Sequence, residues 1–393
     1  MGFLTPVAAA LTLAALVLPV SLAATNLALG ALTAALLLRA RGEGRRLRQA
    51  WKAGPAMLAM ALYAAAGLAA ALFAVDPHEA LRDASKDLHR VWALGLFMAA
   101  VVLEPDVPVM KSLAASFAVM AAYGIGQTAL GGMPERRMIR AHGFVHAVVY
   151  GQQMALGLLG GLCVLARPGG LSPAARRAAI LLCALSATAL ALSQTRMALF
   201  AMTAGFAAIF LLEPRARKWA LPVALAALAA AAAWEFLPTG GRTLSAALGG
   251  FHPNSPHQAR WALWDAAWRM FCDHPWSGAG PGGYKILFPS YHAVPLDGET
   301  NWGSAHNLYL HQLAERGLLG AAALAFLIGV LVRGAWRAAR RGTARGLWAA
   351  ASVTAFLVMS VTETSFQNEQ FATLFLLIWA WGTADLREGE EFL

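Results

Sequence analysis

The chain has 393 residues, of which 59% are hydrophobic and only 13% charged, and its mean hydropathy is +0.55. Apolar stretches of about 20 residues recur along it, a pattern typical of a polytopic membrane protein, and such a composition excludes a soluble globular domain. The formal net charge of +10 comes from basic residues that flank these stretches. It therefore indicates membrane topology and argues against nucleic-acid binding.

Twelve apolar stretches predict an all-α polytopic integral membrane protein with about 12 transmembrane helices. The first two stretches contain no charged residue before Arg39 and lack the basic start and cleavage site of a signal peptide, so both are expected to be retained. The predicted helices lie near residues 4–21, 23–39, 54–74, 91–103, 112–131, 144–166, 178–193, 197–212, 219–236, 308–332, 346–362 and 370–385.

Basic residues divide unevenly between the two sides of this arrangement. Of the 31 lysines and arginines, 19 fall on the side that holds both chain termini, whereas the other side has 12 basic and 13 acidic residues. Because cytoplasmic loops are enriched in lysine and arginine, both termini are predicted to be cytoplasmic. All ten histidines then lie in or beside outward-facing loops: His78, His89, His142, His146, His252, His257, His274, His292, His306 and His311.

The predicted organisation has three parts. Residues 1–236 hold the first nine transmembrane helices, residues 237–307 form one long outward loop, and residues 308–393 hold the last three helices and a short cytoplasmic tail. Among the extramembrane segments, only the long loop is large enough for a small folded element. We therefore expect the functional site there.

Within the long loop, residues 257–276 predict an amphipathic helix that lies at the membrane interface. Pro275 ends it, and Arg260 and Asp265 begin its polar side. Its apolar and aromatic residues are spaced three and four apart, and they are Trp261, Trp264, Ala267, Trp268 and Phe271. The SGAGPGGY stretch at 277–284 is expected to be a turn, because it lacks the preceding strand and following βαβ unit that a dinucleotide-binding loop requires.

Polar positions at the ends of apolar stretches are candidates for chemistry. Arg196 has no acidic neighbour in sequence, and charge at such a depth is costly, so we weigh a functional role against an arginine that reaches to lipid headgroups. Ser304 is expected to cap the next helix, with His306 and Asn307 in its first turn. A neutral histidine at this boundary can accept a proton from a hydroxyl, or it can merely bond to the backbone.

Acidic residues near the outer helix ends allow two interpretations. Glu315 is expected to hold helices together, and Glu363 either does the same or orients a catalytic group. Metal binding has little support, because no HxxxH or HExxH spacing occurs on a helix, and the best acidic pair is Asp297 with Glu299. The three cysteines, two of them in apolar spans, predict neither a disulfide framework nor a thiolate metal site.

Three stretches occur in an order that is typical of a known protein family. They are an SQTR turn at 193–196, an arginine and tryptophan block ending in HPWSGAGPGGY at 260–284, and SAHNLYLHQLAERGLLG at 304–320. This combination resembles the O-antigen ligase and O-antigen polymerase superfamily of bacterial envelope glycosyltransferases, and is most like the lipopolysaccharide O-antigen ligases. One departure is that Trp261 follows Arg260 directly, which leaves Arg269 as a rival for the second arginine of the family pattern.

The resemblance implies a GT-C-like enzyme of the bacterial inner membrane whose active site faces the periplasm. Such an enzyme would transfer a glycan from undecaprenyl diphosphate to a sugar hydroxyl of lipid A-core, with inversion and without a cofactor or metal. His306 would be the general base, and Arg196 and Arg260 would bind the diphosphate. The implied substrate-binding residues are Asn307, Arg269, Trp264, Glu363 and His311. The implied partners are the two glycolipids and membrane lipid, with no nucleic acid.

Other functions stay open at this point. A polymerase of the same superfamily would use a second lipid-linked repeat as acceptor. The protein-directed branch tends to carry a large C-terminal outward domain, and it is disfavoured because only about ten residues follow the last predicted span. A flippase would bind the anionic lipid with buried arginines, and it would show internal repeats that are not evident here. A metal-dependent transferase built on Asp297 and Glu299 would lose its activity in a chelator.

Overall fold

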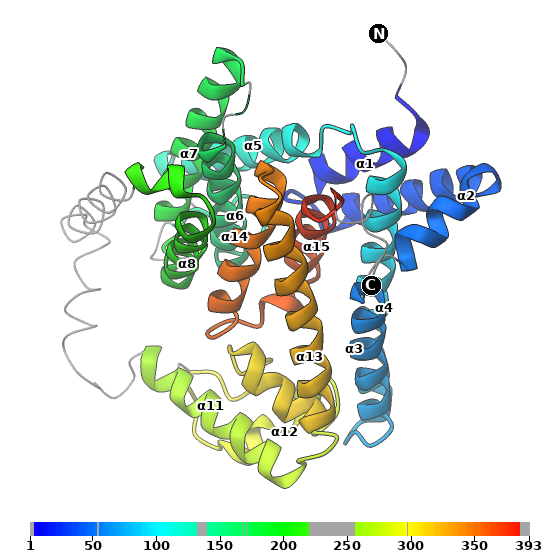
Figure 1. Cartoon of the computed structure of the whole chain (residues 1–393). Helices are drawn as coiled ribbons and strands as arrows, with labels where there is room; N and C mark the ends of the chain where they lie inside the picture. Colours follow the sequence, from blue (N-terminus) through cyan, green and yellow to red (C-terminus); the bar gives the residue numbers. More distant parts are fainter. Residues whose placement is uncertain are drawn as a thin grey trace.

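The computed structural model describes residues 4–52, 55–131, 140–167, 169, 171–219, 256–296 and 298–385. Apart from one isolated bridge between Leu296 and Glu299, the regular structure of these residues is helical, which confirms the all-α prediction for them (Figure 1). The helices are α1 (Pro6–Val17), α2 (Leu22–Lys52), α3 (Ala56–Ala71), α4 (Pro77–Leu103), α5 (Val109–Ala129), α6 (Ala147–Ala166), α7 (Pro173–Leu192), α8 (Arg196–Leu212), η1 (Pro214–Trp219), α11 (Pro256–Asp273), α12 (Gly283–Tyr291), α13 (Leu308–Arg340), α14 (Ala344–Met359), η2 (Ser365–Gln367) and α15 (Glu369–Gly382).

Each predicted span overlaps one of these helices, except the span at 219–236, which lies outside the described residues apart from Trp219 at the end of η1. Five helices are long and apolar enough to cross a membrane, and they lie at Leu22–Arg48, Val109–Ala129, Ala147–Ala166, Pro173–Leu192 and Leu308–Arg340. Shorter apolar helices lie at Pro6–Val17, Ala56–Ala71, Arg196–Leu212 and Ala344–Met359. A polytopic membrane protein fits this architecture, whereas the total of 12 spans and the division at residues 236 and 307 stay predictions.

Helix α4 is much longer than the span predicted at 91–103. It begins after Asp76, whose side chain accepts hydrogen bonds from His78 N and Glu79 N at 3.0 and 3.1 Å and so caps the helix. Its first half carries ion pairs three residues apart, such as Arg82 with Glu79 at 3.3 Å. Helix α4 therefore has a polar first half and an apolar second half. The polar half lies beside the candidate site described below.

Close packing of small residues joins the apolar helices into one core. A Cβ atom at Gly205 of α8 would lie 2.9 Å from the carbonyl oxygen of Ala351 in α14, so the two backbones are nearly in contact. Buried tryptophans fill the wider gaps and bond to neighbouring backbones, as when Trp348 Nε1 donates to Leu156 O at 2.9 Å. These contacts hold the helices that carry the functional residues in fixed positions.

The span predicted at 308–332 is interrupted, which corrects the expectation of one continuous helix. Gly317 has φ 58° and ψ −157°, a conformation open almost only to glycine, and the chain of α13 changes direction there (Figure 1). Residues 277–282 form a turn, as predicted, and Gly283 and Tyr284 begin α12; the start of the turn fits into the break. Ala279 N donates to Ala314 O at 2.8 Å, and Leu318 N donates to Pro275 O at 2.8 Å, replacing the bond that Leu318 would make to Ala314 in a regular helix.

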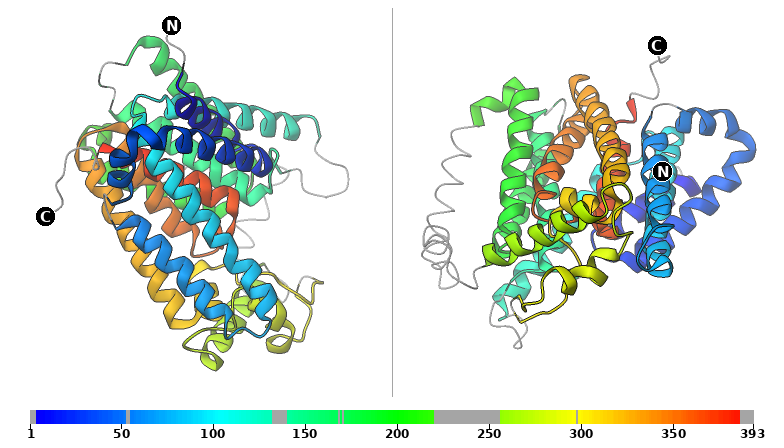
Figure 2. Two further views of the ribbon diagram at one scale, coloured as in Figure 1. Left: turned by 90° about the vertical axis from the view of Figure 1, so that its right-hand side faces the viewer. Right: turned by 90° about the horizontal axis from the view of Figure 1, so that it is seen from below.

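Helices α11 and α12 pack together against the first part of α13 at one end of the structure (Figures 1 and 2). The helix predicted at 257–276 is confirmed as α11. The face that it buries in the protein is largely separate from the tryptophan-rich face that was predicted for the membrane interface. Leu263, Ala267 and Met270 are buried, whereas Trp261 and Trp268 are 58% and 51% exposed. Exposed indole rings suit a membrane interface, where one part of the ring is in an apolar and another in a wet environment.

Candidate functional site

A cavity of about 830 Å³ lies between the polar half of α4, helix α12 and the start of α13. Three residues selected from the sequence, His306, His311 and Glu363, line it. A smaller cavity of about 460 Å³ shares His146 and two other lining residues with it. The structure therefore gathers part of the predicted site around one hollow of the size that a sugar-containing substrate requires.

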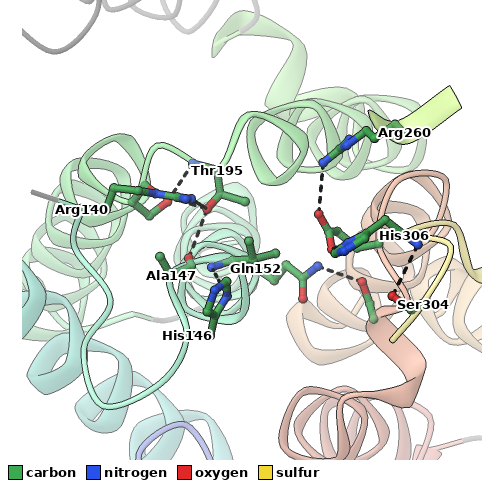
Figure 3. Close-up of polar contacts among 12 residues, drawn as sticks. Arg140, His146, Ala147, Gln152, Thr195, Arg260, Ser304 and His306 are labelled. Carbon is green, nitrogen blue, oxygen red and sulfur yellow. Dashed lines mark hydrogen bonds and ion pairs between the residues drawn. The ribbon is translucent and has the colours of Figure 1, made fainter. Parts of the chain in front are cut away.

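Glu363 contacts both Arg260 and His306, the two residues that matter most to the sequence interpretation. Figure 3 labels Arg260 and His306. Its Oε2 lies 3.0 Å from His306 Nδ1, and its Oε1 accepts a hydrogen bond from Arg260 Nη2 at 3.3 Å. These residues come from three separate segments. Arg260 lies in α11, His306 lies two residues before α13, and Glu363 lies in the loop after α14. When Nδ1 is protonated and donates a hydrogen bond to Glu363, the other ring nitrogen, Nε2, is unprotonated and can accept a proton from a bound hydroxyl.

The backbone around His306 explains how its ring is presented. His306 has φ 47°, which is uncommon for a residue other than glycine, and Trp302 packs edge-on against its ring at 5.8 Å. Asn307 is the N-cap of α13, because its Oδ1 accepts hydrogen bonds from Tyr309 N and Leu310 N at 3.0 and 3.1 Å. The prediction that Ser304 caps the helix is therefore wrong, and His306 precedes the helix instead of lying in its first turn.

The arginines selected from the sequence occupy three different environments. Arg196 opens α8, as the SQTR turn predicted, but its side chain is exposed and pairs with none of the described residues. Arg269 is also exposed; it pairs with Asp265 at 2.7 Å and donates to Tyr291 O at 2.6 Å. Since Arg260 lies beside Glu363 and Arg269 does not, the geometry favours Arg260 over its rival.

Two further residues of the predicted set have structural contacts. Trp264 packs edge-on against Trp261 at 5.3 Å and lies against the core of the α11 and α12 unit. His311 is buried, and its Nε2 lies 3.3 Å from Glu315 Oε2. Glu315 Oε1 in turn accepts a hydrogen bond from Tyr284 N at 3.3 Å, so this carboxylate joins α13 to α12. Of the acidic pair considered for a metal, Asp297 lies outside the described residues.

The sequence interpretation did not select Arg140, which lies near the site (Figure 3). Its Nε donates to Ser193 O at 2.8 Å and its Nη2 to Thr195 Oγ1 at 3.3 Å, while Thr195 Oγ1 donates to Ala147 O at 3.1 Å. Burial lowers the pKa of Arg140, and the Glu363 carboxylate acts in the opposite direction, so the two charges lie within electrostatic reach. The available signal was an arginine on the outward side, where basic residues are less common.

Arg140 is expected to stabilise the SQTR turn. Replacing it with glutamine removes charge-assisted hydrogen bonds to two residues of that turn, so Arg140→Gln should lower the free energy of unfolding by about 1.5 to 3 kcal/mol. Denaturant titration of the detergent-solubilised protein measures this change. The matched control is Arg196→Gln, because Arg196 pairs with none of the described residues, and its unfolding should resemble that of the wild type. Equal destabilisation by both substitutions would contradict the assignment.

The structure has helices apolar enough to cross a membrane and a polar cavity lined by His306 and Glu363, with Arg260 in contact with that carboxylate. These features define a membrane protein with an enzyme-like site. A family model described as O-antigen ligase matches residues 181–325, which include all three sequence stretches that carried the resemblance. This match confirms the predicted resemblance to the O-antigen ligase superfamily over these residues. A comparison with curated proteins finds no match.

Proposed function

We propose that this protein is an O-antigen ligase, which transfers a glycan from undecaprenyl diphosphate to a sugar hydroxyl of lipid A-core in lipopolysaccharide biosynthesis. The observation that carries the proposal is the contact of His306 and Arg260 with the two oxygens of Glu363, beside a cavity of about 830 Å³. Two of these three residues lie in the stretch that matches the O-antigen ligase family. A base and a cation held on one carboxylate suit a reaction in which a proton leaves and an anion departs.

In the proposed reaction, His306 Nε2 takes the proton of the acceptor hydroxyl. The hydroxyl oxygen attacks the anomeric carbon of the donor sugar from the face opposite the diphosphate, which inverts that centre. The carbon–oxygen bond to the diphosphate breaks, and its electron pair leaves with undecaprenyl diphosphate. Glu363 accepts the Nδ1 hydrogen bond throughout, so it holds the ring in position and stabilises the imidazolium that forms.

The leaving diphosphate needs cations where no metal supplies them. We assign this role to Arg260 and Arg196, whose planar guanidinium groups can donate two parallel hydrogen bonds to a phosphate. Arg196 is exposed at the start of α8, so it is free to reach a ligand, whereas Arg260 already lies beside the proposed base. Arg269 would bind only at the outer edge of the site, where it is exposed.

The remaining residues of the predicted set have supporting roles in the proposal. Trp264 and the exposed tryptophans of α11 would shape the opening through which the lipid-linked donor enters from the bilayer. His311 would line the acceptor side of the cavity, and Asn307 would act by holding the start of α13 beside His306. In this proposal the site lies on the periplasmic face of the inner membrane and both termini are cytoplasmic, as the distribution of basic residues predicts.

Transfer in proteoliposomes tests the proposal. The donor is a purified glycan linked to undecaprenyl diphosphate, the acceptor is rough lipopolysaccharide, and an excess of chelator is present. We expect glycan-capped lipopolysaccharide at an undiminished rate, because arginines take the place of a metal. Elongation of the donor-linked glycan would instead identify a polymerase. Movement of the donor across the bilayer without a new bond would identify a flippase, and loss of transfer in chelator would point to a metal-dependent enzyme.

A further inference from the structure

A second group of charges lines the same cavity, apart from the Arg260, Glu363 and His306 contact. Arg90 of α4 and Arg316 of α13 both lie on its wall, and each residue is almost fully buried, with 2% of its surface exposed. Both pair with one carboxylate, that of Asp87: Arg316 Nη1 lies 2.7 Å from Asp87 Oδ2, and Arg90 contacts the other oxygen. Two guanidinium groups therefore share a single buried counter-charge.

The surrounding residues hold the two guanidinium groups without neutralising them. Arg316 lies over the ring of Tyr63 at 4.7 Å, and Arg90 lies over the ring of Phe366 at 5.3 Å. Space for Arg316 depends on Gly67 of α3, where an added Cβ would lie 2.7 Å from Arg316 Nη1. The pair is thus built into the contact between α3, α4 and α13.

Glu315, the carboxylate next to Arg316 in sequence, also lies on the cavity wall but has other partners. Glu315 accepts a hydrogen bond from Tyr284 N and lies beside His311, and it forms no ion pair with either arginine among the described residues. The Nε atoms of Arg90 and Arg316 are buried, and no described residue accepts a hydrogen bond from them. A buried positive charge without a full partner is costly, so this wall of the cavity is suited to an anion.

We propose that Arg90 and Arg316 form an anion-binding subsite that holds an acidic group, a phosphate or a carboxylate, of one of the two substrates. The inference rests on the proposed ligase function, which supplies two such substrates: a donor with a diphosphate and an acceptor oligosaccharide with acidic substituents. Arginine pairs suit this role because they offer several donors in a fixed plane and stay charged when buried. The subsite would select a substrate with a negative charge at a fixed place in the cavity.

Equilibrium binding to the full-length, detergent-solubilised protein tests the subsite without any turnover. Three probes are compared: undecaprenyl diphosphate, a phosphorylated core oligosaccharide, and the same oligosaccharide after enzymatic removal of its phosphates. Arg316→Gln and Arg90→Gln should weaken binding of one of the charged probes about tenfold or more, as expected for loss of a charge-assisted hydrogen bond. Binding of the dephosphorylated oligosaccharide should not change. The control is Arg82→Gln, which removes an exposed arginine of the cavity rim that pairs with Glu79.

Each outcome decides a point. Weaker binding of undecaprenyl diphosphate identifies the donor as the source of the acidic group, and weaker binding of the phosphorylated oligosaccharide identifies the acceptor. Unchanged binding of both charged probes overturns the subsite. If Arg316→Gln does not fold, Gly67→Ala decides the question, because it keeps both arginines but displaces the Arg316 guanidinium. Since binding is measured without transfer, a protein that binds but does not transfer would overturn the ligase proposal and leave the subsite standing.

Discussion

His306→Ala is expected to lower the rate of glycan transfer by about 10²- to 10⁴-fold, the contribution of a well-placed general base. Glu363→Gln should cost about 10²-fold although His306 remains, because the amide cannot stabilise the imidazolium and no longer pairs with Arg260. The double variant should be scarcely slower than His306→Ala, since the two residues act as one unit. Initial rates in proteoliposomes at saturating donor measure all three.

A second histidine and glutamate pair in the same protein supplies the matched control. His89 Nδ1 lies 3.1 Å from Glu369 Oε1, and neither residue lines the larger cavity. Glu369→Gln breaks this pair with the same chemical change, and we expect near wild-type transfer from it. If Glu363→Gln and Glu369→Gln reduce the transfer rate equally, the role of Glu363 is only structural. The proposal that Glu363 orients His306 would then be wrong.

The helix positions could be predicted because the membrane allows few alternatives. An apolar stretch of about 20 residues has to satisfy its backbone hydrogen bonds internally, so it forms a helix wherever it occurs. The site residues His306, Arg260 and Glu363 could be selected for a related reason. Titratable groups are rare in a chain with 13% charged residues, and those that stand at helix ends need an explanation.

Contacts between distant segments could not be predicted from local patterns. Ser304 and Asn307 are both good N-cap residues, and only the backbone turn at His306 decides between them. Arg140 contacts the SQTR turn although the two are separated by more than 50 residues in sequence. A contact over such a separation leaves no periodic signal in the sequence.

The break in α13 was hidden for the same reason. The sequence around Gly317 is typical of a continuous apolar helix, whereas its hydrogen-bond partners lie near Pro275 and Ala279 in another segment. The glycines of the 277–284 turn are required by this contact: a Cβ at Gly278 would lie 2.3 Å from the carbonyl carbon of Glu315. The glycine-rich motif thus joins α11, which carries Arg260, to α13, which follows His306.

Gly317→Ala is expected to abolish transfer by breaking this connection. An added Cβ at Gly317 would lie 2.5 Å from both the carbonyl carbon and the oxygen of Trp276, and the residue would keep a conformation that costs alanine about 3 kcal/mol. Backbone atoms cannot move aside as a flexible side chain does, so α11 must shift and carry Arg260 away from Glu363. Transfer rate and the free energy of unfolding should both fall, by more than about 10²-fold and about 3 kcal/mol.

Gly329→Ala is the matched control, because Gly329 lies later in the same helix with no atom within 4 Å of its added Cβ. Alanine has the higher helix propensity, so this variant should be as stable as the wild type or more stable, with full transfer. Equal behaviour of the two variants would show that the break is not needed. Loss of transfer in Gly317→Ala alone would mean that the reaction depends on a backbone contact between two segments, which fixes the distance between the proposed base and its arginine.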